Sequence, residues 1–230
     1  MKPYLALARV SNLPTVWTNV LAGIVLAIRA FDPRAFWFGI AGISGIYCAG
    51  MVFNDVMDVE EDRVERPGRP IPSGAVTRRA AALFGGVLFL LGLGALLAAS
   101  GLATRTALWS LLLIATVLHY DYWHRRDPLG PFVMGACRGL VYIVAASLVG
   151  GALSVPVLAG AAVIAGYVSL LTLVAKYGGR HYGWSIKWLI AGICLVDALV
   201  IAGTGRWDLA LLASAGFPLT LAGQRAVSGT

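Results

Sequence analysis

The chain of 230 residues is apolar and basic: 59% of its residues are hydrophobic, 13% are charged, and its formal net charge is +7. Soluble domains carry about 25% charged residues, and the mean hydropathy here is +0.80. The composition therefore excludes an ordinary soluble domain and favours a bundle of membrane-spanning helices. Nucleic-acid binding is not expected, because the basic residues are not interleaved with exposed aromatic residues in a soluble module.

Eight apolar segments are long enough, or nearly long enough, to span a bilayer. They cover residues 14–31, 36–54, 80–100, 105–122, 131–150, 155–175, 186–204 and 207–223. The 28 glycines are typical of helices that pack closely in lipid. We therefore expect one all-α transmembrane domain over residues 1–230.

Arginine and lysine alternate between the two sides of these segments. Thirteen fall on one side: Lys2, Arg9, Arg63, Arg66, Arg69, Arg78, Arg79, Arg125, Arg126, Lys176, Arg180, Lys187 and Arg225. Four fall on the other: Arg29, Arg34, Arg105 and Arg206. The bias predicts an integral multi-pass protein with both termini and the loops after spans two, four and six in the cytoplasm. Topology and contacts with lipid headgroups account for most of the positive charge.

The stretch from residue 54 to residue 69 is densely charged, with six acids and three arginines in sixteen residues. Asp55, Asp58 and Asp62 share one helical face. Three carboxylates stacked in this way repel one another unless a cation lies between them, which indicates a divalent metal and a phosphorylated ligand. The helix is expected to stop at Arg66, because Pro67 disfavours a helical residue before it.

This acidic stretch supplies most of the candidate site. The candidate metal ligands are Asn54, Asp55, Asp58 and Asp62, and the three aspartates are also the candidate catalytic residues. The candidate partners of the outer phosphate oxygens are Arg63, Arg66 and Arg69. A solvated loop with local ion pairs is the alternative. The ligand site is favoured because an ionised group at a membrane boundary is costly without a partner.

Other polar residues in and beside the spans are candidates too. Arg138 lies about a turn and a half into a span, where it would either meet a phosphate or extend back to the interface. Lys176 and Arg180, with neighbouring glycine amides, form either an anion cradle or a simple basic loop. Asn19 is a candidate for the acceptor pocket on polarity alone. Asp197 is either functional or buried as a neutral acid.

The order Asn54-Asp55-x-x-Asp58-x-x-x-Asp62, followed by Arg63-x-x-Arg66-Pro67-x-Arg69-Pro70, resembles the first signature of the UbiA superfamily of intramembrane prenyltransferases. The resemblance implies a helical bundle of two four-helix halves around a central cavity. That cavity would lie under cytoplasmic loops and open sideways to lipid. Tyr120-Asp121 and Gly130-Pro131-x-x-Met134-Gly135-x-Cys137-Arg138-Gly139 are similar to the EboC group of UbiA-like proteins, which adds Tyr120 to the candidate substrate-binding residues.

The resemblance also implies a function. Members transfer a prenyl group from a prenyl diphosphate to an aromatic or other lipophilic acceptor, with Mg²⁺ as cofactor. Asp55, Asp58 and Asp62 would chelate Mg²⁺ on the diphosphate. The charge on the leaving pyrophosphate would be neutralised, and an allylic carbocation would remain for the acceptor to attack.

Two departures from the family pattern matter. Typical members carry a second aspartate motif after span six, where this chain has Lys176 and no acid in the loop. Typical members also have nine spans, whereas this chain ends near an eighth. The departures leave open an active enzyme with one metal-binding face and a catalytically degenerate binding or export-associated protein. A CDP-alcohol phosphotransferase is disfavoured, because the D-G-x-x-A-R run of such enzymes is absent.

Overall fold

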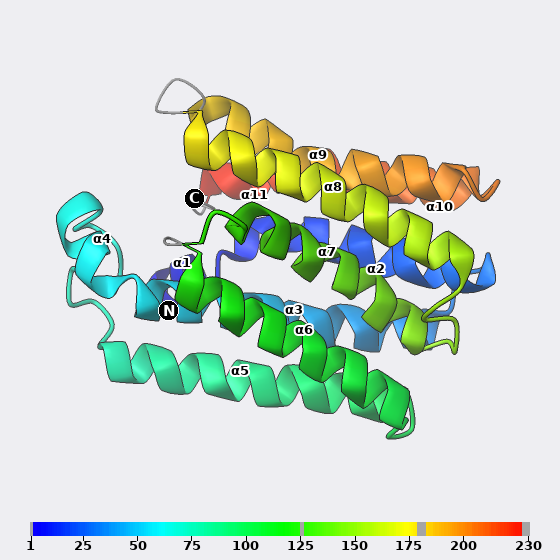
Figure 1. Cartoon of the computed structure of the whole chain (residues 1–230), viewed down its shortest axis with the longest axis horizontal. Coiled ribbons are helices and arrows are strands. Elements are labelled where there is room, and N and C mark those ends of the chain that lie inside the picture. Colours follow the sequence, from blue (N-terminus) through cyan, green and yellow to red (C-terminus); the bar gives the residue numbers. More distant parts are fainter. Residues whose placement is uncertain (1, 125–126, 179–182, 227–230) are drawn as a thin grey trace.

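A computed structural model describes residues 2–124, 127–178 and 183–226. The described chain is a bundle of roughly aligned helices (Figure 1). In chain order these are α1 (Lys2–Leu7), a short 3-10 turn (Val10–Asn12), α2 (Leu13–Ile28), α3 (Pro33–Met57), α4 (Val59–Glu65), α5 (Arg78–Ala99), α6 (Thr104–Trp123), α7 (Gly130–Ser147), α8 (Val155–Tyr177), α9 (Gly183–Ala202), α10 (Trp207–Ser214) and α11 (Gly216–Ala226).

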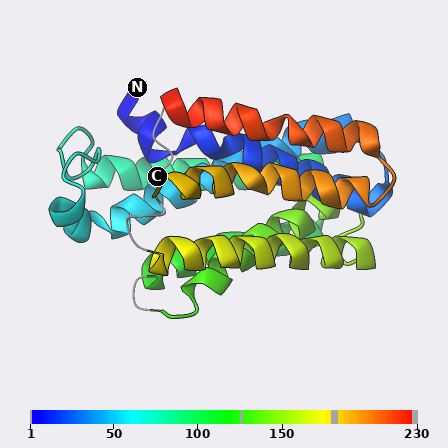
Figure 2. The ribbon, with the colours of Figure 1, turned by 90° about the horizontal axis from the view of Figure 1, so that it is seen from above.

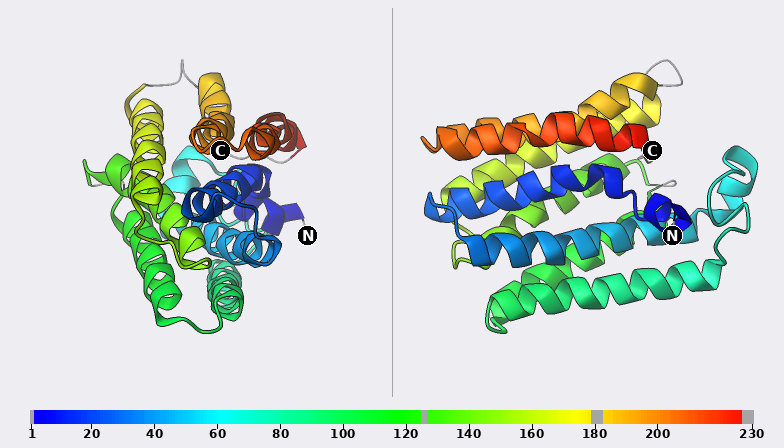
Figure 3. Two further views of the ribbon diagram at one scale, coloured as in Figure 1. Left: turned by 90° about the vertical axis from the view of Figure 1, so that its right-hand side faces the viewer. Right: turned by 180° about the vertical axis from the view of Figure 1, so that it is seen from behind.

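Six helices in the described ranges are long and apolar enough to cross a membrane: Val10–Ile28, Pro33–Met57, Arg78–Ala99, Gly130–Ser147, Val155–Tyr177 and Ser185–Ala202. The prediction of an all-helical membrane bundle is confirmed. The fourth predicted span is α6, a helix of 20 residues that does not reach the same apolar threshold. The eighth is broken between α10 and α11 at Ala215, although the two run on as one rod (Figure 3).

Helix ends follow the sequence closely. Asp32 caps α3 by accepting a hydrogen bond from the Ala35 backbone N–H at 2.8 Å, and Thr77 caps α5 in the same way. The helix of the acidic stretch continues past Met57 as predicted and ends at Glu65, before Pro67. It bends at Asp58, while i→i+4 hydrogen bonds continue through the bend.

Glycine permits two close helix contacts. A Cβ added at Gly92 of α5 would lie 2.6 Å from the carbonyl oxygen of Gly42 in α3. A Cβ added at Gly135 of α7 would lie 2.4 Å from the carbonyl oxygen of Ala165 in α8. Backbones can approach this closely only where a side chain is missing, which is a common way to join helices in lipid.

Two of the three buried apolar clusters among the described residues join the long helices, and the third packs α1 and α4 against α3 and α5. Of the first two, one joins α2 and α7 to α3, α5 and α6, and the other joins α2 and α7 to α8, α9 and α10. Therefore α3, α5 and α6 pack as one group and α8, α9 and α10 as another, and α2 and α7 contribute to both. In Figure 1, α3, α5 and α6 lie below α2 and α7, and α8, α9 and α11 lie above them; Figure 2 shows the long helices running alongside one another.

The two ends of the bundle carry different chain segments and different basic residues. The N-terminal helix α1, the helix α4 and the C-terminal ends of α6, α8 and α11 lie at one end (Figure 1). At the other end, Arg34, Arg105 and Arg206 each donate to a backbone carbonyl oxygen, namely those of Ala98, Gly150 and Arg29. This grouping agrees with the alternation of basic residues. The cytoplasmic assignment of the first end stays a prediction.

Candidate active site

A cavity of about 590 Å³ opens at the end of the bundle that carries α4, and we call it the polar cleft. Its lining joins the three polar stretches of the sequence: Asn54, Asp58, Glu65, Arg66 and Arg69 from the first, Tyr120, His124, Gly130 and Pro131 from the second, and Lys176 from the third. Segments more than 100 residues apart thus meet around one space, as a shared ligand site requires.

The three aspartates of the acidic face are buried, and Asp62 is fully so. Asp55 forms ion pairs with Arg9 and Arg69, each at 3.1 Å. The Arg69 guanidinium also pairs with Asp62 at 2.6 Å. The repulsion among the carboxylates is thus offset in part by two arginines, one from the same stretch and one from the start of the chain.

Asp58 faces the second polar stretch. The His124 Nε2 lies 3.5 Å from an Asp58 carboxylate oxygen, and the His124 ring stacks on Tyr120 with 5.0 Å between ring centroids. Tyr120, which the sequence analysis named as a substrate-binding candidate, is thereby held at the wall of the polar cleft.

Lys176 stands opposite the acidic face in the lining of the polar cleft. Its ammonium donates to the backbone carbonyl oxygens of His124 at 3.1 Å and Asp127 at 2.9 Å. Since an ammonium has three donors, these two bonds fix its position and leave a third proton for a ligand. The predicted partner Arg180 lies outside the described residues.

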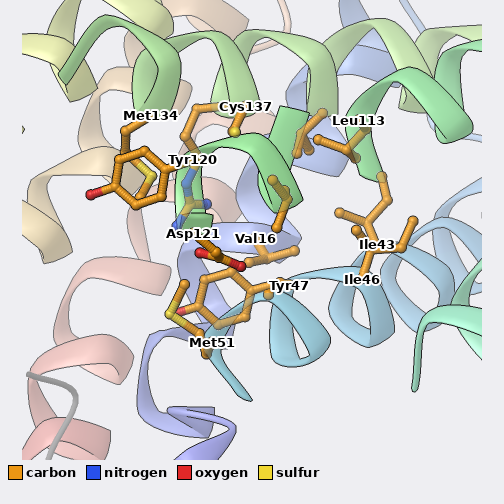
Figure 4. Close-up of a pocket in the computed structure, with 14 residues that line it drawn as sticks. Val16, Ile43, Ile46, Tyr47, Met51, Leu113, Tyr120, Asp121, Met134 and Cys137 are labelled. Carbon is orange, nitrogen blue, oxygen red and sulfur yellow. The ribbon is translucent and has the colours of Figure 1, made fainter. Parts of the chain in front are cut away.

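An apolar cavity of about 70 Å³ adjoins the polar cleft (Figure 4). Met51, Tyr120 and Met134 line both spaces. The remaining wall is mostly aliphatic, with Tyr47, Asp121 and Arg138 as its polar members. The volume is below the ~150 Å³ that admits benzene in an engineered cavity, so a prenyl chain can enter only if wall residues move or if most of the chain extends into lipid.

Arg138 belongs to a buried polar network at this cavity. Its guanidinium donates to the Asn19 side-chain oxygen at 2.8 Å and to the Thr15 hydroxyl at 3.2 Å, and lies over the Tyr47 ring. The Asn19 amide in turn donates to Asp197 at 2.8 and 2.9 Å. Arg138 therefore lies in the apolar cavity and not in the lining of the polar cleft. Asn19 is fully buried between Arg138 and Asp197.

Asp197, for which the sequence offered no partner, has three. The hydroxyls of Thr18 and Tyr142 and the amide of Asn19 all donate to its carboxylate. The network joins α2, α7 and α9 inside the bundle.

Among the three arginines predicted to meet phosphate, Arg66 and Arg69 line the polar cleft. Arg63 does not, because its exposed side chain pairs with Glu60 at 2.6 Å on the outside of α4. The three cysteines, Cys48, Cys137 and Cys194, are free and buried.

The sequence analysis missed two residues of the site. Arg9 was counted only as a topological charge, yet it adopts a left-handed backbone conformation (φ 45°, ψ 46°) and bonds Asp55. A non-glycine residue there costs about 1–2 kcal/mol, so the surrounding contacts impose it. Asp121 is 2% exposed and lies close enough to Asp58 and Asp55 for their charges to act on its carboxyl group. An acid at the end of an apolar span was the available signal for Asp121.

The donor chemistry of the acidic face fits Mg²⁺, which binds oxygen ligands. The buried Asp62 Oδ1 has no hydrogen-bond partner among the described residues. Within the described ranges, no three metal-type side chains converge on one point. Of the three aspartates, only Asp58 lines the polar cleft. Mg²⁺ commonly takes only one or two carboxylates and completes its shell with water and substrate phosphate, so Asp58 fits an ion that arrives with a diphosphate.

Curated relatives are about a third identical to this chain over the parts that align. Digeranylgeranylglyceryl phosphate synthase of Sulfolobus acidocaldarius is 32% identical over 130 residues, which is 56% of this chain and 46% of that protein. The Pyrococcus abyssi protein of the same name is 37% identical over 128 residues, covering 56% and 42%. The chain thus matches less than half the length of these relatives. The narrower likeness to the EboC group stays a prediction.

Solved structures share the fold. A structure of digeranylgeranylglyceryl phosphate synthase covers 96% of this chain and 94% of its own with TM-score 0.66 and 19% identity. A UbiA homologue from Archaeoglobus fulgidus bound to DMAPP and Mg²⁺ covers 99% and 100% with TM-score 0.67 and 14% identity. The model of the UbiA prenyltransferase family matches residues 15–225. The chain therefore belongs to the UbiA prenyltransferase family.

Proposed function

We propose that this protein transfers a prenyl group from a Mg²⁺-bound prenyl diphosphate to a lipophilic or aromatic acceptor within the membrane. The observation that carries the proposal is the junction of a charged cleft with an apolar cavity through Met51, Tyr120 and Met134. A prenyl diphosphate has the same two parts, a charged head and an apolar tail. The relatives named as prenyl-lipid synthases, and the UbiA homologue bound to DMAPP and Mg²⁺, support the same ligand class.

In this proposal the diphosphate lies in the polar cleft. Arg66 and Arg69 face it from the side of the acidic stretch, and Lys176 faces it from α8. Fixed cations neutralise the charge that grows on the leaving diphosphate, without reorganisation at the moment of bond breaking. Lys176 stands where typical family members carry acids, so it replaces a metal-bridged contact with a direct one.

Asn54, Asp55, Asp58 and Asp62 would hold the metal. When bound, Mg²⁺ supplies Lewis-acid stabilisation of the phosphoryl oxygens. Asp55 and Asp62 keep their arginine partners on one side, so the acidic face is ordered before the ligand arrives. The apolar cavity excludes water from the reacting carbon, which protects a carbocation from hydrolysis.

Placement in the cell follows from the same proposal. The polar cleft opens at the end of the bundle rich in arginine and lysine, which the positive-inside bias assigns to the cytoplasm. Water-soluble Mg²⁺ and the diphosphate head would enter from there, and the lipophilic acceptor would enter from the bilayer. Membrane lipids surround the exposed apolar faces of α5 and α8.

The test uses the purified protein in lipid nanodiscs with labelled geranylgeranyl or farnesyl diphosphate, Mg²⁺ and a broad acceptor panel. We expect a prenylated product that needs Mg²⁺ and falls at least ~100-fold in Asp55→Asn, the scale seen when a group that stabilises developing charge is removed. Asp208→Asn is the matched control, because Asp208 pairs with Arg206 at the opposite end of the bundle. No product from any acceptor would count against the proposal.

A second candidate is a binding or export-associated protein without chemistry. Lys176 in place of an acid and the arginine partners of Asp55 favour it. Tight diphosphate binding without product, unchanged by Asp55→Asn, would support this candidate and exclude the first.

A further inference from the structure

Helix α11 is joined to the start of the chain by a buried contact between two side chains. The Gln224 amide donates to the Asn12 side-chain oxygen at 2.9 Å, and both residues are buried. Figure 3 shows α11 running alongside α2 towards the end of the bundle that holds the N-terminus. The polar cleft opens at that same end, yet none of the roles above uses Gln224.

Asn12 belongs to the turn that carries Arg9. Its backbone N–H donates to the Arg9 carbonyl oxygen at 3.1 Å and closes the 3-10 turn Val10–Asn12. Arg9 enters this turn in its left-handed conformation, which a residue with a Cβ keeps only where its surroundings hold it. The Arg9 guanidinium then donates to Asn54 at 3.4 Å and to Asp55 at 3.1 Å. The place of this guanidinium therefore depends on the turn.

Helix α11 packs closely against the turn. A Cβ added at Gly223 would lie 3.2 Å from the Ser11 carbonyl oxygen, so the two backbones are near each other. The Ser11 hydroxyl is buried and has no hydrogen-bond partner among the described residues. The side-chain link between α11 and the turn is thus the bond from Gln224 to Asn12.

Arg9 lines the polar cleft together with Arg66 and Arg69. In the proposed function the diphosphate lies in this cleft, so its oxygens meet the Arg9 guanidinium as well. A guanidinium that is already oriented loses less side-chain freedom when an anion binds, and the affinity is higher for that reason. A residue that fixes the backbone of Arg9 can therefore raise the affinity for the diphosphate without touching it.

We propose that Gln224 is a positioning residue for diphosphate binding. By holding Asn12 it fixes the turn, and the turn directs the Arg9 guanidinium into the polar cleft. The identity of the ligand rests on the proposed function, whereas the effect of Gln224 on Arg9 can be tested without any ligand. Helix α11 would then contribute to the site through one amide group.

The first experiment follows the turn itself, by limited trypsin digestion of the full-length protein in nanodiscs. Cleavage after Arg9 releases residues 1–9, and cleavage after the exposed Arg63 is the internal reference. Both are quantified by mass spectrometry. Gln224→Met keeps the length of the side chain and removes the amide. We expect the ratio of Arg9 to Arg63 cleavage to rise at least about threefold, because proteolysis follows the population of the locally opened form.

Thr220→Val is the matched control on the same helix. Thr220 is fully buried about one turn before Gln224, but its hydroxyl bonds the Gly216 carbonyl oxygen within α11, so the ratio should stay at the wild-type value. Asn12→Ala breaks the bond to Gln224 from the other side and should reproduce the result even if Gln224→Met does not fold. An unchanged ratio in either folded variant, or an equal rise in Thr220→Val, overturns the inference.

The second experiment measures binding of labelled farnesyl diphosphate with Mg²⁺. The affinity should fall about threefold to tenfold in Gln224→Met, the range of one lost hydrogen bond. In an Arg9→Ala background the same substitution should change the affinity less than about twofold, because the residue through which Gln224 acts is gone. An equal loss in both backgrounds would mean a general structural role and would overturn the inference.

The two experiments separate this inference from the proposed function. If the wild-type protein binds the diphosphate and Gln224→Met binds it equally well, the inference fails and the proposed function stands. If the wild-type protein binds no diphosphate, the proposed function fails, and the digestion result alone decides whether Gln224 positions Arg9.

Discussion

Replacing Asp197 by leucine should destabilise the bundle, because the buried carboxylate accepts hydrogen bonds from Thr18, Asn19 and Tyr142. Leucine has a similar size and leaves those three donors without this acceptor. Hydrogen bonds between membrane helices contribute about 0.6 kcal/mol on average and at most ~1.7. Loss of three gives a decrease of about 2–5 kcal/mol in the free energy of unfolding. Arg138 would also lose the Asn19 oxygen as a fixed partner.

The assay is reversible unfolding in mixed micelles of rising SDS content, followed by far-UV circular dichroism. Tyr142→Phe is the matched control, because it removes one donor and keeps the ring, so we expect a loss of about 1 kcal/mol. Asp197→Asn, which keeps one acceptor oxygen, should fall between the two. Replacing buried charge by an apolar group is sometimes stabilising. If the Asp197→Leu protein is as stable as the wild type, the hydrogen bonds to Asp197 do not stabilise the bundle, and the reasoning is refuted.

Three further predictions concern single side chains. Lys176→Glu should weaken Mg²⁺-dependent diphosphate binding at least tenfold, or about 1.4 kcal/mol, in a filter-binding assay, whereas Lys187→Glu, outside the lining of the polar cleft, should not. Arg63→Ala should change the affinity for the diphosphate by less than about twofold, because Arg63 and its partner Glu60 are both exposed on the outside of α4. Gly92→Val should lower the melting temperature, measured by light scattering on heating, because its side chain would meet the Gly42 backbone of α3; an unchanged value would show that α3 and α5 can separate at little cost.

The architecture was predictable because the bilayer constrains the sequence strongly. Long apolar runs, glycine content and the alternation of basic residues are local patterns, and they identified the helices and their ends within a few residues. Pro67 correctly predicted the end of α4. The bend at Asp58 carried no comparable signal. The break at Ala215 did, because Gly216 and Pro218 follow it, and proline lacks the backbone N–H that would continue the helix.

Residues of the site could be predicted from the sequence only where charged residues are closely spaced. The spacing alone places Asp55, Asp58 and Asp62 on one helical face. The structure brings Lys176 and Tyr120 to the polar cleft, which residues of the acidic stretch also line. The placement of Arg63 in the site was not supported, since helix spacing does not say which side of α4 meets the cleft.

Contacts between residues that lie far apart in the sequence could not be predicted from it. Arg9 reaches Asp55 from 46 residues away, and Asn19 reaches Asp197 from 178 residues away. No local pattern joins such pairs, because only the packing of α2 against α9 and of the N-terminal segment against α3 brings them together. Arg138 was expected at a phosphate, yet its depth in α7 places it among Asn19, Thr15 and Tyr47.

The most direct test of the central claim is an experimental structure of the protein in nanodiscs with a farnesyl thiodiphosphate analogue and Mn²⁺ in place of Mg²⁺. The claim is that one acidic face and an opposing lysine hold a prenyl diphosphate at the mouth of an apolar cavity. We predict a metal ion on carboxylate oxygens among Asp55, Asp58 and Asp62, a phosphate oxygen within hydrogen-bond distance of the Lys176 ammonium, and the prenyl tail directed past Met51. A diphosphate bound elsewhere, or bound in the cleft with no metal on the acidic face, would contradict the account.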